Sequence, residues 1–248
     1  MSKNKLVLVA VFVAAWLFLS LFPWQAWFES AAIPRFILGT LLYFVPGALT
    51  FLYVSEDKNF SSRVLLGGFI VSVFVTGLLG VVARLFQLNF TFISWGFALW
   101  GAAMIFLFFA RDIKITFRFA KFTWWEVLSL LLAAGGAVYF ASLVKPPLIH
   151  DDAFTYNALL YYYQHASALV FQFPASLDRL EIPRFWIAYW PLVEALISNL
   201  SGVDGLILTG VYLPPALACL SFLGIYSLGR TLSLPRAAAG LAILAQGF

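Results

Sequence analysis

One short polar stretch of the chain, residues 145–156 (KPPLIHDDAFTY), holds the residue types that most often carry out chemistry. Asp151 and Asp152 are adjacent carboxylates, and His150 precedes them. Two carboxylates at one point of a chain can bind a divalent cation such as Mg²⁺ or Mn²⁺, with the histidine as a weaker ligand. They can also act as a general base and a supporting acid. The sequence therefore makes Asp151 and Asp152 the candidate catalytic or metal-binding residues.

A purely structural role explains the same acid pair. Pro146 and Pro147 end any preceding helix, so a new helix is expected to begin near Asp151. An aspartate at a helix N-cap accepts backbone N–H bonds, and a second aspartate in the first turn suits the helix dipole. A histidine alone, such as His150, is more typical of a surface or packed position than of a ligand. The residues by themselves leave both interpretations open.

The elements that must position these residues are apolar helices. Of the 248 residues, 63% are hydrophobic and 10% are charged, whereas globular domains carry about 25% charged residues. Several apolar runs are long enough to cross a bilayer, and in lipid such runs satisfy their backbone groups as helices. The predicted fold class is therefore all-α, a polytopic transmembrane helical bundle. In such a protein the excess of basic residues reports loop orientation, and we expect no nucleic-acid partner.

Six crossings and part of a seventh are expected. The six runs are residues 6–24, 36–54, 64–86, 92–110, 125–144 and 206–228. The first run has the length of a retained helix, and no small-residue cleavage site follows it closely, which disfavours a signal peptide. A seventh run opens at Ala237 and reaches Phe248 after about 12 residues, too few to span a bilayer. We therefore expect the sequence to be the first part of a longer one.

The long connection, residues 145–205, separates the fifth and sixth runs. It contains two segments that are typical of short helices, residues 153–164 and 186–200, and we expect both at the membrane interface. The organisation is thus a four-helix membrane region, residues 1–124, followed by a second region, residues 125–248.

Basic residues predict the orientation of the chain. With the N-terminus in the cytoplasm, ten of the 15 basic residues fall on the cytoplasmic side and five on the other. The five are Arg35, Arg84, Lys145, Arg179 and Arg184. The positive-inside rule therefore places the connection 145–205 outside the cytoplasm, in a multi-pass protein of the plasma membrane.

The order of short motifs after residue 125 resembles a known family. The acid pair and two following residues, Asp151-Asp152-Ala153-Phe154, stand directly after a predicted crossing, and Tyr189-Trp190-Pro191-Leu192 follows about 35 residues later. Next come a long apolar run, Gly229-Arg230 and the small-residue stretch 236–242. This order is similar to the start of the GT-C glycosyltransferases, in particular the bacterial family similar to protein O-mannosyltransferases and the lipid A aminoarabinose transferase.

The resemblance covers about half of the chain, residues 125–248, and three features depart from it. Four extra helices precede the acid pair, where the family usually has one. The second acid is Asp152 rather than the commoner Glu, and Trp190 replaces a proline. The family's further helices and second external loop do not occur within these residues, so we expect an active site that is incomplete in this chain.

The resemblance implies an integral-membrane enzyme, a glycosyltransferase. It would move a sugar from a polyprenyl-phosphate donor to a glycan, lipid or protein acceptor outside the cytoplasm, with the bilayer as its third partner. Asp151 is then the base or a metal ligand, and Asp152 its partner. The candidate substrate-binding residues are Tyr156, Arg179, Arg184 and Tyr189. Snorkelling of the arginines to lipid headgroups and an aromatic belt of Tyr156 and Tyr161–Tyr163 explain the same residues.

Two other function classes stay open. A transporter or flippase for lipid-linked intermediates needs charged residues inside its crossings. Arg84 and Glu194 are the only candidates, and both lie near the ends of apolar runs. A non-catalytic membrane scaffold is the other class, and it explains the acid pair only as a helix cap.

Overall fold

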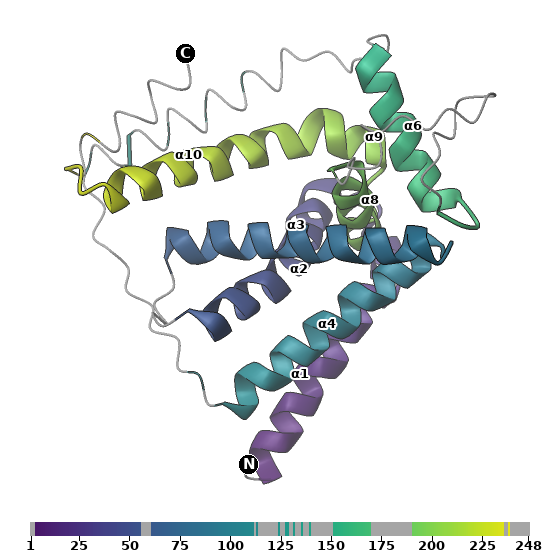
Figure 1. Cartoon of the computed structure of the whole chain (residues 1–248), viewed down its shortest axis with the longest axis horizontal. Helices are drawn as coiled ribbons and strands as arrows, with labels where there is room; N and C mark the ends of the chain where they lie inside the picture. Colours follow the sequence, from purple (N-terminus) through teal and green to yellow (C-terminus); the bar gives the residue numbers. More distant parts are fainter. Residues whose placement is uncertain are drawn as a thin grey trace.

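The computed structural model shows an arrangement of helices (Figure 1). It describes residues 3–55, 61–111, 113, 124, 127–128, 131, 135, 139, 151–169, 190–235 and 238. The elements are α1 (Lys3–Leu21), η1 (Trp24–Phe28), α2 (Ala32–Val54), α3 (Ser62–Leu85), α4 (Phe90–Ala110), α6 (Asp151–His165), α8 (Trp190–Ser201), α9 (Gly205–Ile207), η2 (Leu208–Tyr212) and α10 (Leu213–Thr231). Within these residues no strand occurs, which confirms the all-α prediction for this part of the chain.

Among the residues that the structure describes, five helices are long and apolar enough to cross a membrane, which fits a membrane-embedded protein. They are Asn4–Leu21, Ala32–Val54, Arg63–Leu85, Phe90–Ala110 and Gly205–Thr231. Their positions match the first four apolar runs and the sixth. The predicted fifth crossing, residues 125–144, lies outside the described residues except for a few isolated helical positions, and the seventh lies outside them except for residue 238. Both stay predictions.

The last long helix contains a change of helical type at two prolines. The π-helical turn η2 ends at Tyr212, and Pro214 and Pro215 follow in the first turn of α10. Proline has no backbone N–H, so each of the two removes one hydrogen bond from the preceding turn. A π-helical turn is a local way for a helix to accommodate such a disruption. Residues 205–231 therefore remain one long helical segment.

One end of the bundle, which we call the Gln25 end, is held together by bonds to backbone carbonyls. The Gln25 Nε2 atom donates to the Leu200 carbonyl at 2.9 Å. The backbone N–H of Leu169 donates to the Leu88 carbonyl at 2.8 Å. These bonds bring together the segments that follow α1, α3, α6 and the end of α8.

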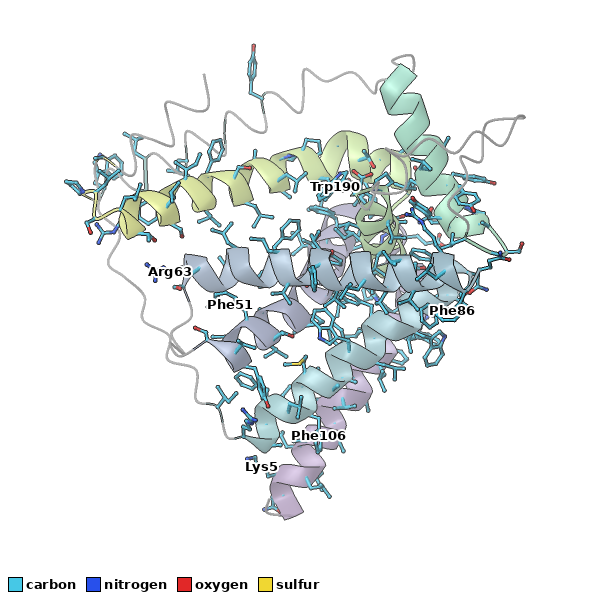
Figure 2. All side chains as sticks on the ribbon, in the orientation of Figure 1. Lys5, Phe51, Arg63, Phe86, Phe106 and Trp190 are labelled. Atoms are coloured by element: carbon cyan, nitrogen blue, oxygen red, sulfur yellow. The ribbon has the colours of Figure 1, made fainter. Side chains whose placement is uncertain are left out.

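The other ends of these helices lie at the opposite end of the bundle, which we call the Arg63 end. Arg63 at the start of α3 donates from Nη2 to Thr231 Oγ1 at the end of α10, at 3.2 Å. The Arg111 guanidinium carbon lies 4.3 Å from the centre of the Tyr53 ring. Figure 2 shows Arg63 and Phe86 at the two ends of α3. Helices α1 to α4 thus run alternately between the two ends, and α10 runs in the same direction as α4.

Glycines allow α2 and α3 to approach closely. A Cβ atom at Gly47 would overlap the carbonyl oxygen of Gly68, and a Cβ at Gly68 would come within 2.8 Å of the Ala48 Cα atom. The Ser72 hydroxyl of α3 donates to the Tyr43 carbonyl of α2 at 2.8 Å. Small residues that bring helix backbones together are typical of packing inside membranes.

Gly47→Ala is expected to lower the stability of the bundle by about 1–3 kcal/mol, the usual cost of overpacking. The added methyl group meets a backbone oxygen, which cannot rotate away. Gly210→Ala is the matched control, because nothing lies within 4 Å of a Cβ at that position. Thermal unfolding of the purified variants in detergent measures the difference. Equal stability of Gly47→Ala and Gly210→Ala would contradict the observed contact between α2 and α3.

Two exposed serines test the predicted orientation. Ser167 lies beyond α6 near the Gln25 end, and Ser233 lies beyond α10 near the Arg63 end. In a chain that lacks the exposed Cys219, a membrane-impermeant maleimide should label Ser167→Cys in intact cells. It should label Ser233→Cys only after permeabilisation. The reverse pattern would place the Gln25 end in the cytoplasm.

Candidate functional site

Helix α6 begins at Asp151, as predicted. Both aspartates therefore lie in the first turn of the helix. Tyr156 lies one turn further along the same helix. The side chains of these three residues lie outside the described part of the structure. So do His150, Arg179, Arg184 and Tyr189, and with them the predicted substrate contacts.

The C-terminal half of α6 is fixed in the core of the bundle. Tyr163 is buried, and its hydroxyl accepts a hydrogen bond from the Arg84 guanidinium. The Arg84 guanidinium carbon also lies 5.2 Å from the centre of the Tyr163 ring. A cation over an aromatic ring is attracted by the ring's electron-rich face. This pair ties α6 to the last turn of α3.

This contact adds to one prediction and corrects another. Arg84 was predicted outside the cytoplasm near the end of an apolar run, and the structure shows in addition that only 4% of it is exposed. Its position in the last turn of α3 suits the helix dipole, which favours a cation there. Tyr163 was expected in an aromatic belt at the membrane interface, and it packs in the core instead. Tyr161 is exposed, and its ring stacks on His165 with the centroids 4.0 Å apart.

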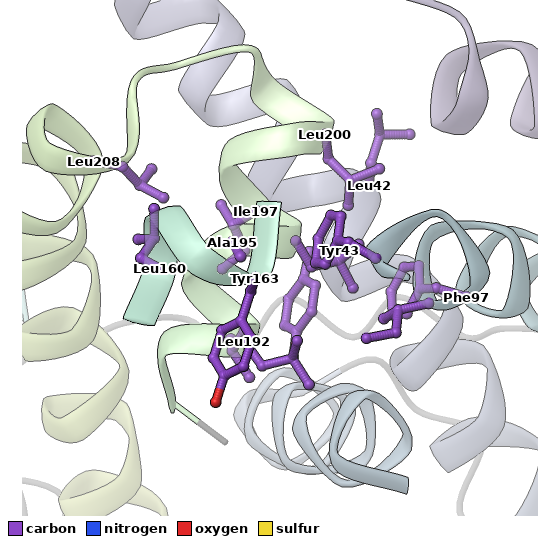
Figure 3. Close-up of a cluster of buried hydrophobic side chains, with 14 of the residues drawn as sticks. Leu42, Tyr43, Phe97, Leu160, Tyr163, Leu192, Ala195, Ile197, Leu200 and Leu208 are labelled. Carbon is purple, nitrogen blue, oxygen red and sulfur yellow. The ribbon is translucent and has the colours of Figure 1, made fainter. Parts of the chain in front are cut away.

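Helix α8 lies at the centre of the helix cluster that holds α6. Ten of its 12 residues are buried, and it packs against α2, α3 and α6. Figure 3 shows Leu192, Ala195 and Ile197 of this helix beside Tyr163 and Tyr43. A helix that is covered on every side belongs to a protein core. The predicted interfacial position of this segment stays a prediction, but its burial among the other helices was not expected from the sequence.

Glycines on the neighbouring helices make room for α8. A Cβ atom at Gly39 of α2 would lie 2.5 Å from the Ser201 Cβ atom. A Cβ atom at Gly80 of α3 would overlap the Leu192 side chain. Both glycines thus lie where α8 packs closely against its neighbours. Their role can be recognised in the sequence only once the partner helix is known.

Glu194 is a buried acid within α8. Only 3% of it is exposed. Burial raises the pKa of Glu194 to about 7, because the charged carboxylate loses its water, and the side-chain hydrogen bond with Trp190 opposes part of this effect. The carboxyl group therefore titrates close to neutral pH in the middle of the helix cluster. The sequence identified Glu194 as a charge near the end of an apolar run but did not predict its burial.

A polar cavity of about 500 Å³ lies at the Gln25 end. Parts of α1, α4, α6 and α8 line it. The polar side chains in its wall are Ser20, Asn89, Thr91, Ser94, Gln164, His165, Ser167 and Asn199. These residues are far apart in the sequence and did not stand out as a group before the fold brought them together.

Metal binding at the acid pair stays a prediction. Asp151, Asp152 and His150 are the residues that would hold a divalent cation, and their side chains lie outside the described ones. Among the residues that the structure does describe, no three His, Cys, Asp or Glu side chains gather as metal ligands would.

Comparison with known proteins found no matching family model, no matching curated protein and no matching solved structure.

Proposed function

We propose that the protein is an integral-membrane glycosyltransferase that takes its sugar from a polyprenyl-phosphate donor. The observation that supports the proposal is the position of the acid pair. Asp151 and Asp152 open helix α6, and the other half of α6 is fixed in the core through Tyr163 and α8. A catalytic group on a rigid element is held in a reproducible position, which lowers the cost of reaching the reacting geometry.

The proposed reaction needs one base and one site for the leaving phosphate. Asp151 accepts the proton of the acceptor hydroxyl, and the oxygen of that hydroxyl forms a new bond to the anomeric carbon of the sugar. The bond from the anomeric carbon to the phosphate oxygen breaks, and polyprenyl phosphate leaves with the electron pair. Asp152 is the supporting acid beside this base. Arg179 and Arg184 are the proposed contacts of the phosphate, because arginine binds phosphate in a bidentate manner.

Exposed apolar side chains suit the lipid part of such a donor. The five long helices present large hydrophobic residues on the outside of the bundle, among them Ile70 and Phe74 of α3 and Val211 beside α10. We place the protein in the plasma membrane, with the acid pair outside the cytoplasm, on the basis of the basic residues in its sequence.

A transporter or flippase of lipid-linked intermediates is the second candidate. It is favoured by the burial of Arg84 and Glu194 between helices, since charged groups inside membrane bundles often mark a pathway. Arg84, however, is engaged by Tyr163, which gives it a structural use. The acid pair at the start of α6 has no role in this second function.

The experiment uses membranes that contain the full-length protein. A panel of polyprenyl phosphates that carry different radioactive hexoses and pentoses is added, together with an extract that supplies glycan, lipid and protein acceptors. The proposal predicts that one donor loses its sugar to an extractable acceptor only when the protein is present. Retention of every sugar on its lipid carrier would contradict the enzyme assignment.

A further inference from the structure

Two long helices reach the same membrane boundary at the Arg63 end. The apolar span Arg63–Leu85 begins with an arginine, and the apolar span Gly205–Thr231 ends one residue after another arginine, Arg230. Both arginines are exposed. The boundary of an apolar span lies at the level of the lipid headgroups. The two guanidinium groups therefore lie at the depth where the phosphate groups of the lipids are found.

A hydrogen bond holds Arg63 against the end of α10. Its Nη2 atom donates to Thr231 Oγ1 at 3.2 Å. The Thr231 hydroxyl donates its own hydrogen to the Ser227 carbonyl at 2.8 Å, so it acts as an acceptor toward Arg63. Next to this bond, a Cβ atom at Gly224 of α10 would lie 3.8 Å from the Leu66 side chain of α3. Arg63 thus lies at a contact between two helices and has a defined position.

Most donors of the two arginines are unused. Within the described part of the chain neither arginine has an ion pair. Arg63 donates only to Thr231, and Arg230 donates from Nη1 only to the Leu234 carbonyl, at 2.9 Å. A guanidinium has five N–H donors in a planar fork that matches the geometry of phosphate. Each arginine therefore has donors left for an anion.

The charge of the Arg63 end favours a partner with net negative charge. The segments of the sequence that are predicted on this side hold ten basic residues. They hold four acidic ones, Glu56, Asp57, Asp112 and Glu126. Such an excess of basic residues attracts lipids with anionic headgroups. A zwitterionic headgroup carries a positive amine as well as its phosphate and gains less from the same charges.

An apolar stripe continues from Arg63 along α3. Ile70 and Phe74 follow Arg63 by seven and eleven residues, which places all three on one face of the helix. The side chains of Ile70 and Phe74 are each 64% exposed. An apolar stripe next to a cationic group suits an acyl chain next to its phosphate. A phospholipid therefore matches both parts of this surface, whereas a free phosphate matches only one.

We infer that Arg63 and Arg230 bind the phosphate headgroup of an anionic phospholipid, whose acyl chain lies along Ile70 and Phe74. A phosphate that binds both arginines links α3 to α10. The inference concerns residues other than the acid pair and does not depend on the proposed transfer reaction.

The test measures lipid binding and not activity. Native mass spectrometry of the purified full-length protein in detergent counts the bound lipids and ranks their affinities. The probes are phosphatidylglycerol, phosphatidylcholine with the same acyl chains, and glycerophosphoglycerol, which is the anionic headgroup without chains. Phosphatidylglycerol should bind about tenfold more tightly than phosphatidylcholine, because only the first has a net charge. Glycerophosphoglycerol at the same concentration should not displace it.

Arg63→Gln and Arg230→Gln should each weaken the binding of phosphatidylglycerol about tenfold, the effect of losing one charge-assisted bond. Arg111→Gln is the matched control. Arg111 is an exposed arginine at the same end, but its guanidinium lies over the Tyr53 ring. This variant should bind the lipid as the wild type does. Attraction by net charge alone would make the three substitutions equal.

Two further variants separate a lipid site from a contact that only holds α10 in place. Thr231→Val removes the hydrogen bond to Arg63 but keeps both guanidinium groups, so its lipid binding should stay close to that of the wild type. Phe74→Ala shortens the apolar stripe and should weaken binding about fivefold. Phe106→Ala is its control, because Phe106 is an exposed phenylalanine on a different helix, α4 (Figure 2).

Four results would overturn the inference. They are equal binding of phosphatidylcholine and phosphatidylglycerol, displacement of the lipid by glycerophosphoglycerol, equal binding by Arg63→Gln and Arg111→Gln, and a loss in Thr231→Val as large as that in Arg63→Gln. Thermal unfolding without added lipid shows whether each variant is folded. If Arg63→Gln does not fold, Arg230→Gln replaces it in the comparison with Arg111→Gln, because the side chain of Arg230 makes no described contact with another helix.

Discussion

Asp151→Asn is expected to lower the rate of sugar transfer by the full-length protein about 100-fold or more, the usual effect of removing a general base. The amide has nearly the same volume as the carboxylate but cannot accept the proton of the acceptor hydroxyl. Membrane insertion and the amount of folded protein should stay as in the wild type. Transfer from a radioactive polyprenyl-phosphate sugar gives the rate, and size-exclusion chromatography in detergent gives the folded amount.

The same substitution separates catalysis from helix capping. Because α6 begins at Asp151, a structural aspartate there acts in the first turn through the helix dipole, an effect of about 0.3–1 kcal/mol. Asparagine is also a good residue at a helix N-terminus. Asp152→Asn is the matched control, and it should cost less than Asp151→Asn if Asp152 only supports its neighbour. A transfer rate of Asp151→Asn equal to that of the wild type would remove Asp151 from the site.

Glu194→Gln is expected to change how stability depends on pH. Burial raises the pKa of Glu194 from 4.5 to about 7 in the folded protein. The folded state therefore keeps its proton where the unfolded state has lost it. The contribution of Glu194 to stability is complete below pH 4.5, falls as the pH rises from 4.5 to about 7, and is constant above that. The total fall corresponds to about 3 kcal/mol.

Glutamine keeps the shape of a protonated glutamate but has no proton to lose. The variant should therefore lack this fall and should be more stable than the wild type at pH 8. Chemical unfolding of the purified protein at several pH values from 4 to 8 measures how the free energy of unfolding depends on pH. Asp204→Asn is the control, since Asp204 is an exposed N-cap of α9, and this variant should keep the fall. Parallel pH profiles of Glu194→Gln and the wild type would show that Glu194 is solvated in the folded protein.

Local sequence signals predicted the positions of the helices well. The long apolar runs required helices for physical reasons that do not depend on their neighbours, because lipid cannot satisfy a free backbone group. The start of α6 at Asp151 agrees with the helix start that was predicted from the position of Pro146 and Pro147 in the sequence. Both are properties of a short window of sequence.

The burial of α8 could not be predicted in the same way. In a soluble protein an apolar stripe shows which side of a helix faces the core. In a membrane protein the outer face of the bundle is also apolar, so the sequence of α8 is compatible with a surface position and with a central one. Only its close contacts with α2 at Gly39 and with α3 at Gly80 show that its position is central.

The positions of Arg84 and of the cavity-lining polar residues could not be predicted from the local sequence either. A cation in the last turn of a helix is expected to reach the membrane surface, but the ring of Tyr163, 79 positions away in the chain, binds Arg84 inside the bundle. The cavity is likewise assembled from the ends of α1, α4, α6 and α8. Ser20 and Asn199 are ordinary polar residues until the fold brings them to one wall.

The chemical fate of the donor tests the central claim most directly. A polyprenyl-phosphate sugar is prepared with one radioactive label in the sugar and another in the phosphate, and is incorporated into vesicles with the full-length protein and an acceptor. A glycosyltransferase breaks the bond between them, so the sugar label should move to the acceptor while the phosphate label stays with the lipid. If both labels instead move together from one leaflet to the other, the protein is a flippase and the proposed function is wrong.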